Sequence, residues 1–168
     1  MSATQTAPAT PLLQGPLRDE LAVEHLLDME VELQPAQVIP TATGTIMNFV
    51  ADGGSFQGPR LQGEVLRGGG DGLIVGSDQI GRVDVRATLR TEDGVLIQFT
   101  AGGVIRIAPD GLERLAAGER LPYEQTYVRT TPRLESADER YAWLAEHVLV
   151  GLNELSKDHI DYRVYRLK

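Results

Sequence analysis

GRVDVRATLRTEDG, residues 81–94, alternates apolar and polar side chains along its length. A period of two is typical of a β-strand with one buried face, and Glu92-Asp93-Gly94 at its end predicts a hairpin turn. The two rows are Val83, Val85, Ala87 and Leu89 on one side, and Asp84, Arg86, Thr88 and Arg90 on the other. Small closed barrels usually fill their interior with apolar side chains, whereas a ligand-binding barrel needs a few convergent polar groups inside. We predict that Asp84 and Arg86 face the interior.

Short apolar runs separated by glycine and proline continue on both sides of this strand. The 168 residues include 18 glycines and 9 prolines, which is typical of many short strands joined by tight turns. We therefore predict an all-β, mainly antiparallel fold. It would be a closed lipocalin-like β-barrel of about nine strands with one short helix, because closure removes exposed strand edges. Residues 21–168 would form this single domain, and residues 1–20 a flexible leader.

One segment carries a clear helix signal. Ser136 followed three residues later by Glu139 matches a capping box, and residues 137–146 contain good helix formers. Tyr141 and Leu144 recur at helical spacing, so this helix should pack on the sheet. A second, shorter stretch, residues 112–118, is predicted as a loop with a helical turn.

Composition excludes several classes of function. The formal net charge of −8 and the scattered arginines argue against a nucleic-acid partner. The absence of cysteine excludes disulfides, thiolate catalysis and sulfur-ligated zinc, and no nucleotide-binding motif occurs. The three histidines are far apart in the sequence, and no apolar run is long enough to span a membrane. We expect a cytoplasmic protein that binds a small organic ligand, with no metal or other cofactor, no membrane partner, and a homodimer left open beside a monomer.

Three groupings of acids with arginine or tyrosine are candidates for chemistry: Asp71; Asp84 with Arg86; and Asp93 with Tyr127 and Arg129. Each also has an ordinary structural interpretation. A carboxylate beside glycine often shapes a turn, and an Asp–Arg pair on one strand face is often an exposed ion pair that contributes little. The residues alone therefore predict a β-rich domain and leave a polar cavity open as an alternative.

Four strings in a fixed order resemble the domain-of-unknown-function family 3237, also named uncharacterised protein family 0311. They are GGSFQGPRLQGEVLRGGGD (53–71), DVRATLRTEDG (84–94), YVRTTPRLE (127–135) and RYAWL (140–144). The resemblance covers roughly residues 22–167 and implies a small, single-domain, lipocalin-like barrel of a kind found in bacteria, in a family without an established common activity. The residues that match the family pattern are Asp71, Asp84, Arg86, Thr91, Asp93, Gly94, Arg129, Pro132, Tyr141, Trp143 and Leu144.

The chain departs from the family pattern at four positions, and three of them lose an aromatic ring. Gly72 replaces a Trp, Ala87 a Tyr, Val128 a Phe, and Ala145 an Asn. A buried ring covers about 150–250 Å². The resemblance therefore implies a larger pocket wherever these positions face the interior, and only a different surface where they face outward. The residues expected to line the ligand cavity are Gly72, Thr91, Asp93, Tyr141 and Trp143.

Two functions from different classes fit this pattern. The first is a cofactor-free enzyme of the isomerase, cyclase or lyase type that acts on an aromatic or polyketide-like carbonyl compound. Asp71 or Asp84 would be the base, Arg86 and Arg129 would bind the developing anion, and Tyr127 would donate a hydrogen bond. The second is a non-catalytic binding or carrier protein that uses the same cavity. A third interpretation, an interaction module with a filled barrel, predicts no cavity.

Overall fold

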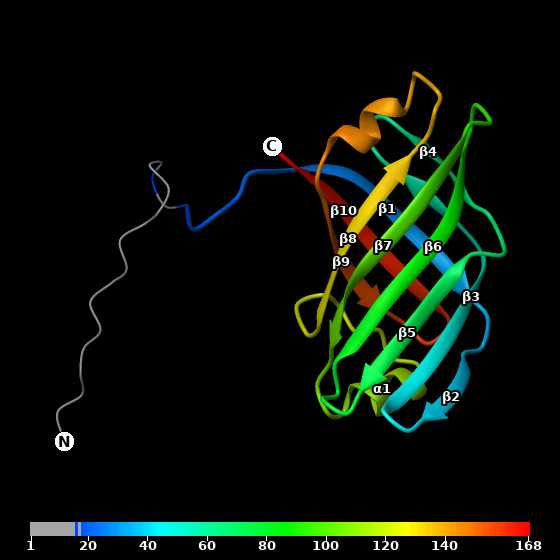
Figure 1. Ribbon diagram of the computed structural model, residues 1–168, viewed down its shortest axis with the longest axis vertical. Coiled ribbons are helices and arrows are strands. Elements are labelled where there is room, and N and C mark those ends of the chain that lie inside the picture. Colours follow the sequence, from blue (N-terminus) through cyan, green and yellow to red (C-terminus); the bar gives the residue numbers. More distant parts are fainter. Residues whose placement is uncertain (1–15, 17) are drawn as a thin grey trace.

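A computed structural model describes residue 16 and residues 18–168 of the chain (Figure 1). Most of the predicted leader, residues 1–15 and 17, lies outside the described part. The strands are β1 (Val23–Leu33), β2 (Gln37–Thr41), β3 (Gly44–Gln57), β4 (Gln62–Val65), β5 (Gly70–Gly76), β6 (Gly81–Thr91), β7 (Leu96–Arg106), β8 (Tyr127–Glu135), β9 (Leu149–Leu155) and β10 (His159–Leu167). The helices are α1 (Gly111–Ala116) and the 3-10 helix η1 (Ala142–Glu146).

The strands close into an antiparallel barrel with eight strand positions. The order around the wall is β1, β10, β9, β8, β7 and β6, then β4 and β5, which share one position, and finally β3, which pairs back with β1. Among the described strands, β2 pairs only with β3 and extends that hairpin beyond the wall. The predicted closed, all-β, mainly antiparallel barrel is confirmed. It has ten strands for eight wall positions, because β4 and β5 share one position and β2 lies beyond the wall.

The alternation in residues 81–94 has the opposite orientation from the one predicted. On β6 the apolar row is buried, and Leu89 is 0% exposed. Asp84 and Arg86 lie on the outer surface, with side chains that are 69% and 76% exposed. The expectation that they face the interior is therefore wrong. Removing the apolar row from water stabilises the barrel, whereas two charged side chains inside it would cost desolvation energy.

One end of the barrel, which we call the η1 end, is covered by η1 and the β6–β7 turn (Figure 1). The predicted helix over residues 137–146 is wrong in its start and its type, because only the 3-10 helix η1 forms. Ser136 is not its cap: its hydroxyl donates to the Leu96 carbonyl at 3.1 Å, which holds this residue beside β7. Asp138 begins the turn instead, since its carbonyl accepts from the amides of Tyr141 and Ala142, both at 2.9 Å.

The opposite end, which we call the open end, lies near α1 and β2 (Figure 1). Leu33, Val83 and Ile160 continue the inward rows of their strands at this end, yet they are only partly buried. These inward side chains are therefore partly exposed to solvent at this end. The short helix α1 agrees with the helical turn expected over residues 112–118. No helix of the described residues is long and apolar enough to cross a membrane.

Candidate functional site

Asp71 is a carboxylic acid on the inner face of the wall near the open end. It follows the tight turn at Gly68, lies two residues before the buried Leu73, and pairs in register with Phe49 on β3 and Val85 on β6. Its Oδ1 accepts a hydrogen bond from the backbone amide of Asp84 at 3.0 Å. Burial raises the pKa of Asp71 to about 6, the amide hydrogen bond opposes that rise, and the negative charge of Asp84 adds to it. The group therefore changes protonation state close to neutral pH.

Tyr162 projects into the same interior from β10. Its side chain is buried, and its ring meets that of Phe99 edge to face, with centroids 5.7 Å apart. Burial raises the pKa of the Tyr162 phenol, and the negative charge of Asp71 raises it further. The phenol is thus a neutral hydrogen-bond donor at physiological pH, and it lies near enough to Asp71 for the two groups to influence each other.

Two further polar side chains are buried beside Tyr162. Asn153 on β9 pairs in register with Tyr162, and its Oδ1 accepts a hydrogen bond of 3.1 Å from the hydroxyl of Thr130 on β8. Asn153 is 0% exposed, and its Nδ2 has no hydrogen-bond partner. A buried amide N–H without an acceptor is costly and uncommon. We call Asp71, Thr130, Asn153 and Tyr162 the inner polar cluster.

Only Asp71 of this cluster was selected from the sequence. The missed residues each place a polar side chain in a row of apolar or small ones: Thr130 follows Val128, Asn153 follows Leu149 and Gly151, and Tyr162 precedes Val164. A polar residue that interrupts an inward row is a usable signal, because burial of such a group must be compensated. The charged residues Asp84, Arg86 and Arg129, which the sequence had suggested instead, lie on rows that face solvent.

Four of the predicted catalytic residues lie on the outer surface. Asp84 and Arg86 form a loose ion pair of 3.7 Å there. Tyr127 is 52% exposed, and Arg129 lies over its ring, donating through Nη1 to the Val128 carbonyl at 2.9 Å. The structure therefore separates these four from Asp71 by the thickness of the wall.

Gly72, predicted to line the cavity, also lies on the outward row of β5, with the exposed Ile74. A Cβ added at Gly72 would meet no atom within 4 Å, and its φ is not in the left-handed region. A tryptophan at this position would therefore cover the outside of the barrel. The larger pocket that this substitution implied is not supported by its orientation.

The other predicted cavity residues meet at the η1 end. The Thr91 hydroxyl donates to Asp93 in the β6–β7 turn, and the Tyr141 hydroxyl also donates to Asp93 Oδ1, at 3.0 Å. Arg140 Nη1 donates to Asp93 Oδ2 at 2.7 Å, while Trp143 donates to the Arg140 carbonyl at 3.0 Å. We call Thr91, Asp93, Arg140 and Tyr141 the η1 lock, because these contacts hold the η1 segment on the turn. They explain the Thr-x-Asp-Gly string structurally.

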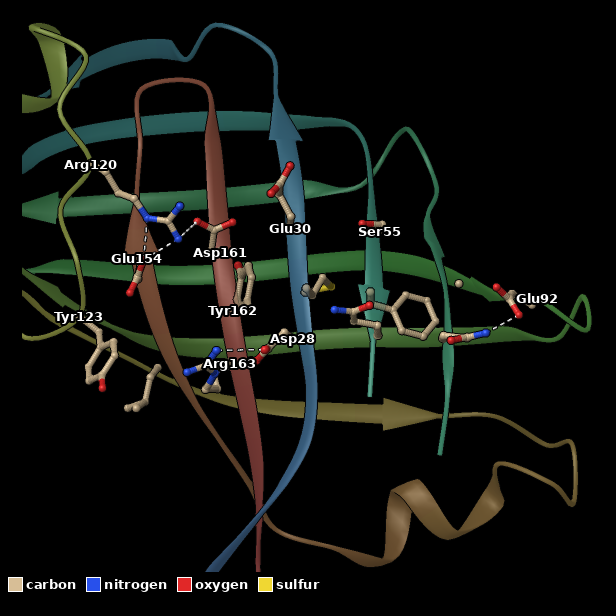
Figure 2. Close-up of a pocket in the computed structure, with 16 residues that line it drawn as sticks. Asp28, Glu30, Ser55, Glu92, Arg120, Tyr123, Glu154, Asp161, Tyr162 and Arg163 are labelled. Carbon is tan, nitrogen blue, oxygen red and sulfur yellow. Dashed lines mark hydrogen bonds and ion pairs between the residues drawn. The ribbon is translucent and has the colours of Figure 1, made fainter. Parts of the chain in front are cut away.

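A groove of about 460 Å³ crosses the outer face of β1, β3, β9 and β10 (Figure 2). Its charged side chains are largely paired with one another. Arg163 donates to both oxygens of Asp28, at 2.8 and 3.0 Å, and Arg120 bridges Glu154 and Asp161 (Figure 2). The hydrogen bond from Arg163 is the main cause of the lowered pKa of Asp28. We place the candidate site at the inner polar cluster, because its acid and its amide are not neutralised in this way.

The described residues were also considered as ligands for a metal ion. Within residue 16 and residues 18–168, no group of three or more His, Asp or Glu side chains is arranged to hold a metal ion. The inner polar cluster itself contains one carboxyl, one hydroxyl, one amide and one phenol. Such a set can exchange a proton and donate hydrogen bonds to an oxygen atom.

Comparisons with known proteins agree with this fold. A UPF0311 protein from Rhodopseudomonas palustris (strain TIE-1) is 28% identical over 116 residues, which cover 68% of this chain and 75% of that protein. A UPF0311 protein from Clostridium acetobutylicum is 26% identical over 114 residues, which cover 68% of this chain and 72% of that protein. A β-barrel-like protein from Acinetobacter baumannii superposes with a TM-score of 0.76 at 28% identity, covering 93% of this chain and 100% of that one. A crystal structure described as an enzyme from Penicillium herquei has a TM-score of 0.67 at 18% identity, covering 92% and 99%. The family described as protein of unknown function (DUF3237) matches residues 21–167, and the chain belongs to this family.

Proposed function

We propose that this protein is a cofactor-independent acid–base enzyme that acts on a small carbonyl compound at the inner polar cluster. The observation that carries the proposal is Asp71, an inward carboxyl whose pKa burial raises to about 6. A general acid or base is most effective when its pKa lies near the working pH, because both protonation states are then available. Asp84, by contrast, lies on the outer surface, away from this interior.

The cluster supplies the parts of a proton transfer next to a carbonyl group. In its ionised form Asp71 removes a proton from the carbon beside the carbonyl, and the electron pair of that C–H bond moves to form the enolate. The Tyr162 phenol, kept neutral by burial, donates a hydrogen bond to the oxygen on which negative charge develops. Where a C=C bond is conjugated with the enolate, return of the proton from Asp71 to the far carbon isomerises the substrate. Where a β-substituent leaves with its bonding electron pair and takes the proton from Asp71, a new C=C bond forms, which is a lyase reaction. Attack of the enolate carbon on an electrophilic carbon of the same molecule closes a ring, which is a cyclase reaction.

The role of the arginines changes in this proposal. Arg86 and Arg129 face solvent, so they do not hold the substrate at the inner polar cluster. The Penicillium herquei protein, which shares the fold, is described as an enzyme, and this supports the idea that such barrels can carry catalysis. A carrier protein would use the same cluster without removing a proton, and the experiment below separates the two.

Proton removal can be measured without the natural substrate. Wild-type protein, Asp71→Asn and the outward control Asp84→Asn are incubated with 1-tetralone in D₂O, and deuterium uptake beside the carbonyl is followed by NMR. We expect exchange with wild type and Asp84→Asn, rising as the pH increases through about 6. Asp71→Asn should bind the ketone but not exchange it. Binding without exchange by wild type would identify a carrier, and undiminished exchange by Asp71→Asn would overturn the role of Asp71.

A further inference from the structure

We infer that Asn153 donates a hydrogen bond from Nδ2 to a carbonyl oxygen of the ligand, so that the interior selects a neutral carbonyl compound with an otherwise apolar body. The inference shares the site of the proposed function but needs only binding there. Asn153 faces inward on β9, is 0% exposed, and its Nδ2 has no partner within the protein. An unpaired donor on the inner face of the barrel is available to an acceptor supplied by a ligand.

The direction of the free donor follows from the bond that the amide already makes. Oδ1 of Asn153 is turned toward β8, where the Thr130 hydroxyl donates to it at 3.1 Å. The amide nitrogen is the other end of the same planar group, and Tyr162 is the register partner of Asn153 on the neighbouring strand β10. Thr130 acts as a positioning residue, because its hydrogen bond fixes which end of the amide is free. Nδ2 and the phenol can then serve the same ligand oxygen.

The stability of the fold does not require an amide side chain at position 153. A leucine has a similar volume and would occupy the same place without leaving a buried N–H unpaired. The inward rows of the two neighbouring strands carry buried apolar side chains, among them Val128 on β8 and Val164 on β10, which are 1% and 0% exposed. The arrangement combines an apolar wall with one fixed donor, which is how ligand sites orient an apolar molecule.

The charge inside the barrel favours a neutral ligand over an anion. Asp71 carries negative charge above a pH of about 6. In residue 16 and residues 18–168, no arginine or lysine side chain is buried, so a ligand carboxylate would meet no enclosed cation. A ketone, aldehyde or ester carbonyl accepts a hydrogen bond without bringing a charge into the interior.

A matched pair of probes tests the inference. The first is 1-tetralone, and the second is 1-methylenetetralin, in which a CH₂ group replaces the carbonyl oxygen. We expect wild type to bind the ketone about tenfold more tightly, the scale of one hydrogen bond in a buried site. Asn153→Leu should prefer the ketone clearly less than wild type does, because only the Tyr162 phenol is then left to donate, and Thr130→Val should also reduce the preference. Thr131→Val, which removes an outward hydroxyl next to Thr130, is the control and should keep it.

A direct readout in wild type makes the result independent of whether a variant folds. The Nδ2 amide protons of Asn153, followed by ¹⁵N–¹H NMR, should shift with 1-tetralone and not with its methylene analogue. Asp71→Asn should retain the preference for the ketone even where deuterium exchange is lost, so failure of catalysis and failure of this inference give different results. The inference would be overturned if wild type bound the two probes equally up to their solubility limit, or if Asn153→Leu kept the full preference of wild type for the ketone.

Discussion

Asp71 and Thr91 both face the barrel interior, but they lie near opposite ends of it. Val85, the register partner of Asp71, is separated from Thr91 by six residues of β6, which corresponds to about 20 Å along the strand. The family-like polar residues therefore do not form one site. Asp71 belongs to the inner polar cluster, and Thr91 belongs to the η1 lock.

Replacing Asp71 with Asn should stabilise the protein at neutral and alkaline pH. The pKa of Asp71 is raised from 3.8 to about 6 in the folded state, so folding disfavours the ionised form. Wild type then loses stability as the pH rises from about 4 to about 6, by at most about 3 kcal/mol, and solvent screening of the partly exposed carboxyl reduces this figure. Urea unfolding of both proteins at pH 4, 6 and 8 should show a difference that grows with pH. Asp110→Asn, whose carboxyl makes no capping bond to α1, is the control, and a difference that shrinks with rising pH would contradict the assignment.

Replacing Asp93 with Asn should lower the melting temperature at pH 7. The hydrogen bond from Thr91, followed by that from Tyr141 and the charge of Arg140, lowers the pKa of Asp93. A lowered carboxyl pKa stabilises the fold above the ordinary value of 3.8, and this stabilisation is lost as the pH falls below it. The deficit of the variant should therefore disappear in acid. Glu139→Gln in the same segment should have no effect, because the predicted capping box does not form; an equal loss in both variants would argue against the η1 lock.

Replacing Arg86 with Ala or Lys should change little. The side chain is 76% exposed, and its ion pair with Asp84 spans 3.7 Å. Exposed pairs of this kind contribute about 0–1 kcal/mol. Both variants should keep the unfolding free energy of wild type and its affinity for 1-tetralone. Weaker ketone binding by both would show that the outer surface takes part in recognition.

Two glycine substitutions should have opposite outcomes. Gly72→Trp should fold normally and leave ketone binding unchanged, because the new side chain starts in open space on the outer face. Gly103→Ala should destabilise the barrel by about 1–3 kcal/mol, since its Cβ would lie 2.4 Å from the backbone oxygen of Arg129. Thermal melts of the two variants check this contrast. Loss of ketone binding in a folded Gly72→Trp protein would restore the idea that position 72 borders the ligand.

The sequence predicted the strands well because their signal is local. Alternation with period two appears in residues 81–94 and again in β8 and β10, and burial then selects one face. β2 was missed because its five residues are all exposed and include Pro40, so no buried row marks it. The helix after Ser136 was predicted from its composition, but hydrogen bonds to Leu96 and Asp93, far away in sequence, determine the conformation of that segment.

The candidate site was predicted only in part because it depends on register between distant strands. Asp71 was identified from its place after the glycine run, yet its partner Tyr162 is 91 positions later in the chain and comes close only when the barrel closes. The prediction for Asp84 and Arg86 was wrong because it gave weight to their chemistry. Burial of the apolar row on the other face of β6 contributes more free energy, and it decides which face is inside.

Because the η1 lock and the inner polar cluster lie far apart, the residues of one can be changed without changing the contacts of the other. Inward positions near the open end, such as Val83 and Ile160, can be randomised in a mutant library without disturbing the contacts among Thr91, Asp93 and Tyr141. Natural divergence has the same freedom, so two relatives can share the contacts of the η1 lock and still differ at the inward positions near the open end. Comparisons of proposed ligand sites between relatives should therefore be based on the residues around Asp71, whereas the contacts of Thr91, Asp93 and Tyr141 identify only the scaffold.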